Sequence, residues 1–248
     1  MGLFGSIFSK KLKRDPFDLS VFKVDMHSHL IPGIDDGSKS MDETIAMLAK
    51  FESLGFKKVI TTPHIMSDHF RNTPEIILSG LAKVQVELKR INLNIEIEAA
   101  AEYYYDETLM EKLKNKEKLL TFGDNYLLFE FSFHSEPSQI DALIFEMITQ
   151  NYKPVLAHFE RYVFLHGSID KATEWRSKGV SIQLNYNSLA GHYGPEVLKQ
   201  ARKLVDSGQI DFVATDCHRI EHLMTLEENL SGAYFHKLGE LTLKNSIL

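Results

Sequence analysis

Seven short apolar runs rich in β-branched residues alternate with helical patterns along this 248-residue chain. Repeated strand–helix–strand units build a parallel sheet, because the chain must cross back over the sheet between successive strands. Seven such units favour a closed α/β barrel over an open sheet. The expected strands are residues 22–26, 58–61, 95–99, 126–129, 154–157, 180–184 and 211–214.

Segments between these strands carry helix signals. Ser40 and Glu43 have the spacing of a capping box, and Thr73 precedes a proline, which the first turn of a helix tolerates. The expected helices are residues 40–54, 73–93, 138–150 and 195–207.

The composition fits a single domain behind a short tail. With 44% hydrophobic residues the chain can bury one substantial core, and barrels of this length are commonly one domain. We expect a tail over residues 1–20 and a domain over residues 21–248. The net charge of −6 argues against a nucleic-acid partner, which would need a clustered basic surface. The single cysteine, Cys217, rules out an intramolecular disulfide and fits a cytoplasmic protein.

The first fourteen residues place an apolar stretch before a basic run, the reverse of the order in a secretory signal. Leu3, Phe4, Ile7 and Phe8 would share one face of a short helix, next to cations that attract anionic lipid. This pattern is compatible with a weak tether to the inner membrane face, and equally with a disordered tail or a tail docked on the core, which are the commoner structures for such a terminus. No later stretch approaches the ~20 apolar residues of a membrane span.

Histidines and carboxylates gather at or just past the ends of the expected strands, where active sites of α/β barrels form. Imidazole together with carboxylate suits zinc, manganese or iron, whereas magnesium or calcium would call for oxygen ligands alone. Nine ligands would serve two or three ions with positions left for water and substrate. The sequence therefore predicts a multinuclear metallohydrolase with the ligands His27, His29, Asp35 or Asp36, His64, Glu102, Glu130, His158, Asp216 and His218.

Seven motifs in order then carry a family resemblance. Together they resemble the bacterial protein tyrosine phosphatases of the PHP (polymerase and histidinol phosphatase) superfamily, over about residues 24–218. One such motif is common among metal hydrolases, but seven in order are specific. The motifs are Asp25-Met26-His27-Ser28-His29, Gly33-Ile34-Asp35-Asp36-Gly37, Thr62-Pro63-His64, Ala101-Glu102-Tyr103-Tyr104, Leu128-Phe129-Glu130-Phe131, Ala157-His158-Phe159-Glu160-Arg161-Tyr162 and Asp216-Cys217-His218.

The resemblance implies a distorted (β/α)7 barrel of the PHP type with three divalent ions, manganese first, with iron or zinc as alternatives. It also implies that Arg161 holds the substrate phosphate, and that the substrate is a phosphotyrosine protein, a bacterial tyrosine kinase controlling exopolysaccharide or capsule synthesis. Carried over by position, one ion takes His27, His29, Glu102 and Asp216, a second shares Glu102 and adds Glu130 and His158, and a third takes Asp36, His64 and His218.

Aryl phosphates suit such a centre. A water between two ions loses a proton near neutral pH and can attack phosphorus in line. A tyrosine leaving group, with a pKa of about 10, needs less protonation than an alkyl alcohol. Where the family often has a second arginine, this chain has Arg219 or His222. Polar residues that follow the motifs at the strand ends are candidates for leaving-group donors or phosphate contacts. They are His69, Arg71, Arg219 and His222.

Some residues keep two interpretations. Asp35 could replace Asp36 as a ligand, or cap the turn before the first helix. Asp25 could orient a ligand histidine or only end its strand. Glu160 could pair with Arg161 and remove the arginine from phosphate binding.

Other functions also stay open. Cys217 suggests a cysteine-nucleophile phosphatase, but the glycines and the arginine spacing of that class are missing, and strand alternation points the thiol away from Asp216 and His218. A small-molecule phosphomonoesterase, such as a histidinol-phosphate phosphatase, could use the same barrel and metals. A non-catalytic scaffold that binds the kinase is the third alternative, although intact ligands at every motif argue against it.

Overall fold

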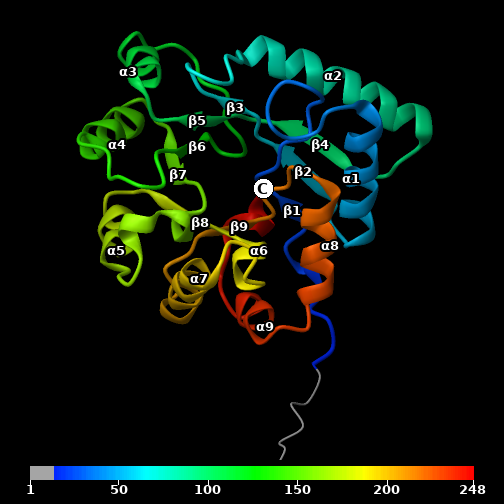
Figure 1. Ribbon diagram of the computed structural model, residues 1–248. Helices are drawn as coiled ribbons and strands as arrows, with labels where there is room; N and C mark the ends of the chain where they lie inside the picture. The colour runs from blue at the N-terminus through cyan, green and yellow to red at the C-terminus, as the bar shows by residue number, and fades with distance from the viewer. Residues whose placement is uncertain (1–13) are drawn as a thin grey trace, which may run out of the picture.

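A computed structural model describes residues 14–248, in which parallel strands are surrounded by helices (Figure 1). The strands are β1 Val24–Asp25, β2 Lys58–Thr61, β3 His64–Ile65, β4 Glu96–Ala99, β5 Glu102–Tyr104, β6 Tyr126–Glu130, β7 Lys153–Leu156, β8 Ser181–Asn185 and β9 Phe212–Ala214. They form two sheets, in the orders β1-β2-β4 and β3-β5-β6-β7-β8-β9, with every neighbouring pair parallel.

Two of the expected strands continue beyond a break. Thr62-Pro63 separates β2 from β3, and Ala100-Ala101 separates β4 from β5. Residues within both breaks still hydrogen-bond to the chain segment alongside. Thr62 N donates to Ser28 O at 2.6 Å, and Ala100 N donates to Thr61 O at 2.9 Å. Pro63 has no N–H to give to a ladder, which accounts for the first break. Each broken strand therefore pairs in one sheet with its first part and in the other sheet with its second.

The first and last strands close the circuit. Ser28 and Cys217 form a parallel bridge just past β1 and β9. His29 N donates to Cys217 O at 2.8 Å, and Asp216 N donates to His27 O at 2.9 Å. The broken β2–β3 and β4–β5 each count as one strand of the circuit, so the expected distorted barrel of seven parallel strands is confirmed.

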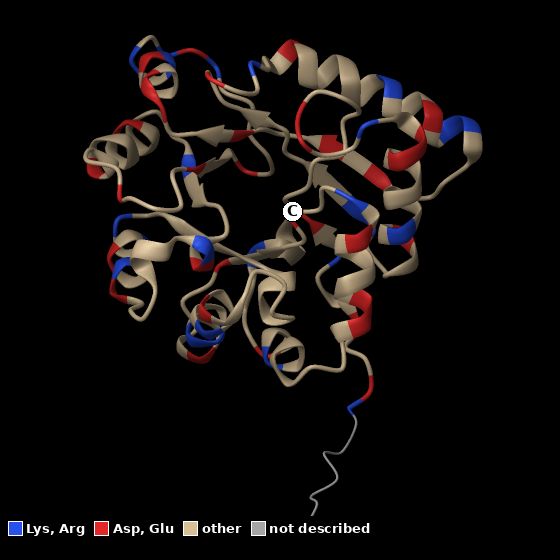
Figure 2. Cartoon of the chain, viewed as in Figure 1, with Lys and Arg blue, Asp and Glu red and all other residues tan. Residues whose placement is uncertain are grey.

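Helices pack around the outside of this barrel (Figure 1), and residues of both charges are interspersed along them (Figure 2). The four expected helices are confirmed as α1 Met41–Ser53, α2 Pro74–Ile91, α4 Ile140–Thr149 and α7 Pro195–Ser207. Ser40 Oγ accepts from Glu43 N at 3.2 Å, as the capping box predicts, but Glu43 Oε2 accepts from Lys39 N at 2.8 Å instead of from Ser40 N. The remaining α-helices of the described chain are α3 Glu107–Lys114, α5 Asp170–Ser177, α6 Tyr186–Leu189, α8 Ile220–Asn229 and α9 Ala233–Gly239.

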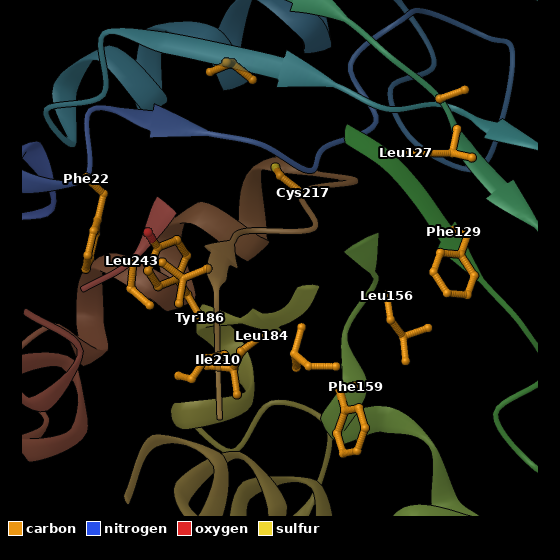
Figure 3. Packing of buried hydrophobic residues seen from close by; sticks show 14 of the residues in the cluster. Phe22, Leu127, Phe129, Leu156, Phe159, Leu184, Tyr186, Ile210, Cys217 and Leu243 are labelled. Atoms are coloured by element: carbon orange, nitrogen blue, oxygen red, sulfur yellow. The ribbon is translucent and has the colours of Figure 1, made fainter. Parts of the chain in front are cut away.

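The apolar core has two parts because successive strand residues face opposite sides. The larger part lies between strands and helices and includes Leu127, Phe129, Leu156 and Leu184 (Figure 3). The smaller part fills the barrel, with Leu248 packed against it at the end where the strands begin. Its members are Val24, Met26, Ile60, Ala100, Phe122, Tyr126, Leu128, Val155, Ala157, Phe212 and Ala214.

Residues just before position 21 also contact the rest of the described chain. Leu19 is buried, and Phe17 N donates at 3.0 Å to O of Leu230, at the end of α8. The apolar side chains expected to tether the chain to a membrane, within residues 1–13, lie outside the described residues. Within residues 14–248, none of the helices combines the length and apolar character that a membrane crossing requires.

Candidate metal centre

The nine expected metal ligands meet at the carboxyl ends of the barrel strands, opposite Leu248. Six of them end a strand or follow one within a few residues. His64 and Glu102 instead begin β3 and β5, the short second parts of the two broken strands, and Asp36 lies in the loop before α1. The breaks at Thr62-Pro63 and Ala100-Ala101 thus place His64 and Glu102 at the same level as the other ligands. Because the closed barrel brings all its carboxyl ends to one rim, residues up to 191 positions apart converge there.

Glu102 lies at the middle of the cluster. Its Oε2 is 3.1 Å from His27 Nε2, 3.4 Å from His29 Nε2 and 3.2 Å from His64 Nδ1. Its Oε1 is 3.2 Å from His158 Nε2. One carboxylate therefore contacts four imidazoles, as expected of a group that bridges ions.

Three sets of side chains have ligand atoms that all lie within 4.8 Å of one another. Most members agree with the sets expected from the sequence. Two differences are that His29 also joins the set of Asp36, His64 and His218, and that His64 also joins the set of Glu102 and Glu130. His158 Nε2 is 3.5 Å from Glu130 Oε2, so it adjoins the same set. The sets are His27, His29 and Asp216; His64, Glu102 and Glu130; and His29, Asp36, His64 and His218.

Two of these side chains stand on backbone that L-residues rarely adopt. His158 has φ 33° and Asp216 has φ 50°, both in the left-handed region. Around Asp216, the conformation is held by Asp25, which accepts from Thr215 N at 2.7 Å and from Thr215 Oγ1 at 3.1 Å. Asp25 therefore fixes the chain just before Asp216, which differs from both of its expected functions.

Asp35 and Asp36 have separate contacts. Asp35 Oδ2 is 2.8 Å from His29 Nδ1, and its Oδ1 accepts from Gly37 N at 3.0 Å, so Asp35 caps the turn and orients His29. Asp36 Oδ1 lies 3.6 Å from His64 Nε2 and 3.3 Å from His218 Nε2. Burial raises the pKa of Asp36, but the hydrogen bond and charge of His218 outweigh it and leave the pKa at about 2. Asp36 is thus an ionised carboxylate that faces the outer histidines.

Arg161 points its guanidinium at the cluster. Its Nη1 donates to Asp216 Oδ2 at 2.9 Å, and its Cζ lies 4.5 and 4.6 Å from the ring centres of Phe133 and Tyr193. The expected alternative, a pair between Glu160 and Arg161, is not what the structure has. Glu160 Oε1 instead accepts from Asn185 N at 3.0 Å and from Ser188 Oγ at 2.5 Å.

The other expected substrate contacts are divided. Arg219 is exposed and lines a cavity of about 410 Å³ together with Asp36, Lys39 and His218. His222 is buried, and its Nδ1 lies 3.4 Å from His218 N and 3.2 Å from Asp216 O. Burial lowers the pKa of His222 to about 4, so this ring is neutral.

His69 and Arg71 are exposed on the loop before α2. Between them, Phe70 stacks on His64 with ring centres 5.4 Å apart. This loop therefore covers one side of the cluster with an aromatic ring, and its two polar candidates face solvent.

Two buried amides contact the ligands but were not predicted. Gln183 and Asn185 lie on β8, the strand that supplies no ligand, and they hydrogen-bond to His27, His158 and Asp216. The signal in the sequence is faint, because amides are common in proteins and form no metal motif. Only their alternation at the end of a ligand-free strand, Gln183-Leu184-Asn185, could have indicated them.

With the geometry established, comparison with known proteins decides the family. The family described as capsular polysaccharide synthesis, CpsB/CapC, matches residues 23–233. This chain belongs to the CpsB/CapC family. Over 232 residues it is 30% identical to CapC of Staphylococcus aureus, covering 91% of this chain and 90% of CapC. Over 203 residues it is 30% identical to the tyrosine-protein phosphatase CpsB of Streptococcus pneumoniae, covering 80% of this chain and 84% of that protein.

The fold of the CpsB/CapC family is also found in solved structures. One crystal structure comes from a study of YwqE from Bacillus subtilis and CpsB from Streptococcus pneumoniae, described as metal-dependent tyrosine phosphatases. It matches with a TM-score of 0.75 at 24% identity, covering 89% of this chain and 96% of that one. An amidohydrolase from Mycoplasma synoviae matches at a TM-score of 0.51 and 14% identity. The resemblance inferred from the seven motifs is thereby confirmed.

The charges in this CpsB/CapC site fit divalent ions. Burial lowers the pKa of His27, but the carboxylates of Glu102 and Asp216 outweigh it and raise that pKa from 6.5 to about 9. Without ions, protons on the imidazoles must therefore neutralise the buried carboxylates. His27 Nε2 and His29 Nε2 face each other at 3.3 Å, where two protons would repel but one cation can accept both lone pairs. The residues present thus fit a multinuclear metal centre.

Cys217 lies outside this centre. Its sulfur is 3.6 Å from Met47 Sδ, and Cys217 belongs to the larger apolar cluster, part of which is drawn in Figure 3. Burial raises the pKa of the thiol well above its usual range. The thiol is therefore directed away from Asp216 and His218, as strand alternation predicted, and is unsuited to act as a nucleophile.

Proposed function

We propose that this protein is a metal-dependent protein tyrosine phosphatase. The observation that carries the proposal is the convergence of five imidazoles and four carboxylates on one rim with an immobilised arginine directed at them. Membership of the CpsB/CapC family supports the same function, since relatives in it are named tyrosine-protein phosphatases.

We assign three divalent ions to the nine expected ligands, with manganese as the first candidate and iron or zinc as alternatives. Asp35 orients His29 in this assignment and is not itself a ligand. When bound, the ions supply Lewis acidity for activating water and for neutralising phosphoryl charge. The ligands His27, His29, Glu102, Glu130, His158 and Asp216 are nearly fully buried, whereas Asp36, His64 and His218 lie toward the open side.

Arg161 binds the phosphoryl oxygens in this proposal. Its guanidinium packs on the rings of Phe133 and Tyr193, and Nη1 donates to Asp216. Arginine presents several coplanar N–H donors, so the edge that remains can donate to two oxygens of a phosphate at once. Its 25% exposed side chain keeps this edge accessible.

The phosphorylated residue enters from the cavity beside Asp36 and His218. Lys39 and Arg219 supply positive charge to that cavity, whose lining also includes the carboxylates of Asp36, Glu43 and Glu221. His222 is buried against the backbone of residues 216–218, so it is not assigned a contact with the phosphate. The proposed substrate is phosphotyrosine of a bacterial tyrosine kinase that controls exopolysaccharide or capsule synthesis, in the cytoplasm.

The test is turnover of a phosphotyrosine peptide and of histidinol phosphate by metal-stripped protein, resupplied separately with manganese, iron, zinc or magnesium. We expect peptide turnover that requires metal, is abolished in His158→Ala and persists in Cys217→Ser. Preference for histidinol phosphate would instead indicate a small-molecule phosphomonoesterase. An absence of turnover with every metal would support the scaffold alternative.

A further inference from the structure

The strand that supplies no ligand carries a pair of amides placed to prepare the ligands. We propose that Gln183 and Asn185 are positioning residues, which keep a proton on Nδ1 of His27 and turn one oxygen of Asp216 toward the ions. This inference rests on the metal centre of the proposed function. It concerns the binding of ions and not the identity of the substrate.

The contacts form one chain through the base of the site. Gln183 Oε1 lies 2.8 Å from His158 N and 3.1 Å from His27 Nδ1. Gln183 Nε2 donates to Asn185 Oδ1 at 2.7 Å, and Asn185 Nδ2 donates to Asp216 Oδ2 at 2.8 Å. Gln183 and Asn185 alternate along β8, so both side chains leave the same face, and both are fully buried.

The direction of every hydrogen bond follows from one fixed donor. The backbone N–H of His158 can only donate, so the atom of Gln183 that faces it must be the oxygen. The amide nitrogen of Gln183 then faces Asn185, which must answer with its own oxygen. That leaves the Asn185 nitrogen to donate to Asp216. A single backbone group thus sets the orientation of both amides.

Two ligands are prepared as a result. His27 must carry its proton on Nδ1 to donate to Gln183, which leaves the lone pair of Nε2 for an ion. Asp216 Oδ2 is occupied by Asn185 and by Arg161, so Oδ1 is the oxygen that faces the centre, 3.4 Å from both His27 Nε2 and His218 Nδ1. Asp35 does for His29 what Gln183 does for His27, since it accepts from His29 Nδ1.

An amide suits position 183 better than a carboxylate would. Two carboxylates, Glu102 and Asp216, already lie 3.1 and 3.4 Å from His27 Nε2, so another negative charge beside His27 would add repulsion among buried carboxylates. A carboxylate also cannot donate to Asn185, and Asn185 would then be free to turn its oxygen toward Asp216. Only a group that both accepts and donates transmits the orientation from His158 to Asp216.

Asn185→Asp tests the last link with almost no change of shape. One oxygen of the introduced carboxylate can still accept from Gln183, but its second oxygen faces the carboxylate of Asp216 and repels it. We expect the affinity for at least one manganese ion to fall by about 10- to 100-fold, a range typical of residues that orient metal ligands. The matched control is Asn245→Asp, because Asn245 is equally buried but hydrogen-bonds only backbone groups of Val24 and Val213.

Gln183→Met tests the first link, with Gln200→Met as its control. Gln200 is as buried as Gln183 but binds backbone groups of Leu165, Gly167 and Ser168, away from the centre. In zinc-loaded protein, a ¹H–¹⁵N correlation spectrum should show a slowly exchanging proton on Nδ1 of His27. We expect that proton to exchange faster in Gln183→Met and to stay protected in Gln200→Met.

Metal titration of the asparagine variants and proton exchange in the glutamine variants decide the inference. Equal metal affinity in Asn185→Asp and Asn245→Asp would overturn it, and so would a His27 proton that exchanges as slowly in Gln183→Met as in the wild type. If Asn185→Asp or Gln183→Met fails to fold, the other variant alone tests the inference. Phosphatase assays are run separately. If phosphotyrosine is not hydrolysed while Asn185→Asp still weakens ion binding, the proposed function fails and the positioning inference stands.

Discussion

At the scale of single residues, Arg161 offers the sharpest test of phosphate binding. Arg161→Lys keeps the positive charge but loses both the planar group held between Phe133 and Tyr193 and the paired donors. We expect kcat/KM for a phosphotyrosine peptide to fall by about 10- to 100-fold, which corresponds to roughly 1.5–3 kcal/mol for a hydrogen bond to a charged group. Competitive inhibition by inorganic phosphate should weaken by a similar factor.

Arg219→Lys is the matched control, since Arg219 is exposed and approaches the site only across the cavity. Its effect should stay below about threefold, because lysine keeps the charge and an exposed arginine has no fixed planar contact to lose. A loss in Arg161→Lys as small as that in Arg219→Lys would show that Arg161 contributes charge alone. A tenfold or larger loss confined to Arg161→Lys would support paired donation to the phosphate.

Residues of the candidate metal centre could be predicted because their chemistry is uncommon and their position is set by topology. Histidine and carboxylate after successive strands converge wherever the sheet closes, so His27 and Asp216 could be assigned to one centre from the sequence. Gln183 and Asn185 could not, since their importance depends on hydrogen bonds between neighbouring strands. The orientation of Asp35 toward His29 and the burial of His222 likewise depend on side-chain packing that spacing does not encode.

At the scale of elements, the loop between β1 and α1 passes close to the centre. A Cβ added to Gly37 would lie 2.2 Å from His29 O and 2.4 Å from His29 Cβ, and neither atom can move without the strand end. Gly37→Ala should therefore destabilise the protein by about 1–3 kcal/mol, as overpacking usually does. Because His29 is displaced, manganese affinity should fall as well.

Urea unfolding of metal-free protein measures the first effect, and manganese titration the second. Lys39→Ala, at an exposed position of the same loop, should leave both values near those of the wild type. Unchanged manganese affinity in a destabilised Gly37→Ala protein would mean that the loop relaxes without moving His29.

Helices with clear boundary signals, such as α1 and α2, were predicted to within two residues, since Ser40 and Thr73 cap them locally. Strand breaks were not predicted. Ala100-Ala101 offers no local signal, and β5 exists because Glu102, Tyr103 and Tyr104 pair with β6, which is a long-range contact. The helix α8 begins at Ile220 without a side-chain cap, so its first turn carries no sequence signal of the kind that marks α1.

At the scale of the whole molecule, the candidate metal centre places several carboxylates close together at one end of the barrel. The stability of the barrel therefore depends on the protons or metal ions that neutralise these carboxylates. In metal-free protein the protonated His27 serves this purpose, with its pKa raised from 6.5 to about 9 by the balance of burial and the carboxylates Glu102 and Asp216. A raised pKa contributes stability that is fully present below pH 6.5 and is lost as the pH rises through about 9. The loss amounts to roughly 3 kcal/mol at most for a shift of this size.

Metal-free protein should therefore show a Tm that falls between pH 6.5 and pH 9.5, by about 2–4 °C for each kcal/mol lost in a chain of this length. Manganese-loaded protein should show no such fall, because ions take the place of the protons and bind more tightly as the imidazoles deprotonate. Calorimetry across this pH range on both forms, with His27→Gln as a third sample, measures the difference. A metal-free Tm that rose with pH would mean that the carboxylates are neutralised by other groups, and that His27 does not carry the charge balance of the barrel.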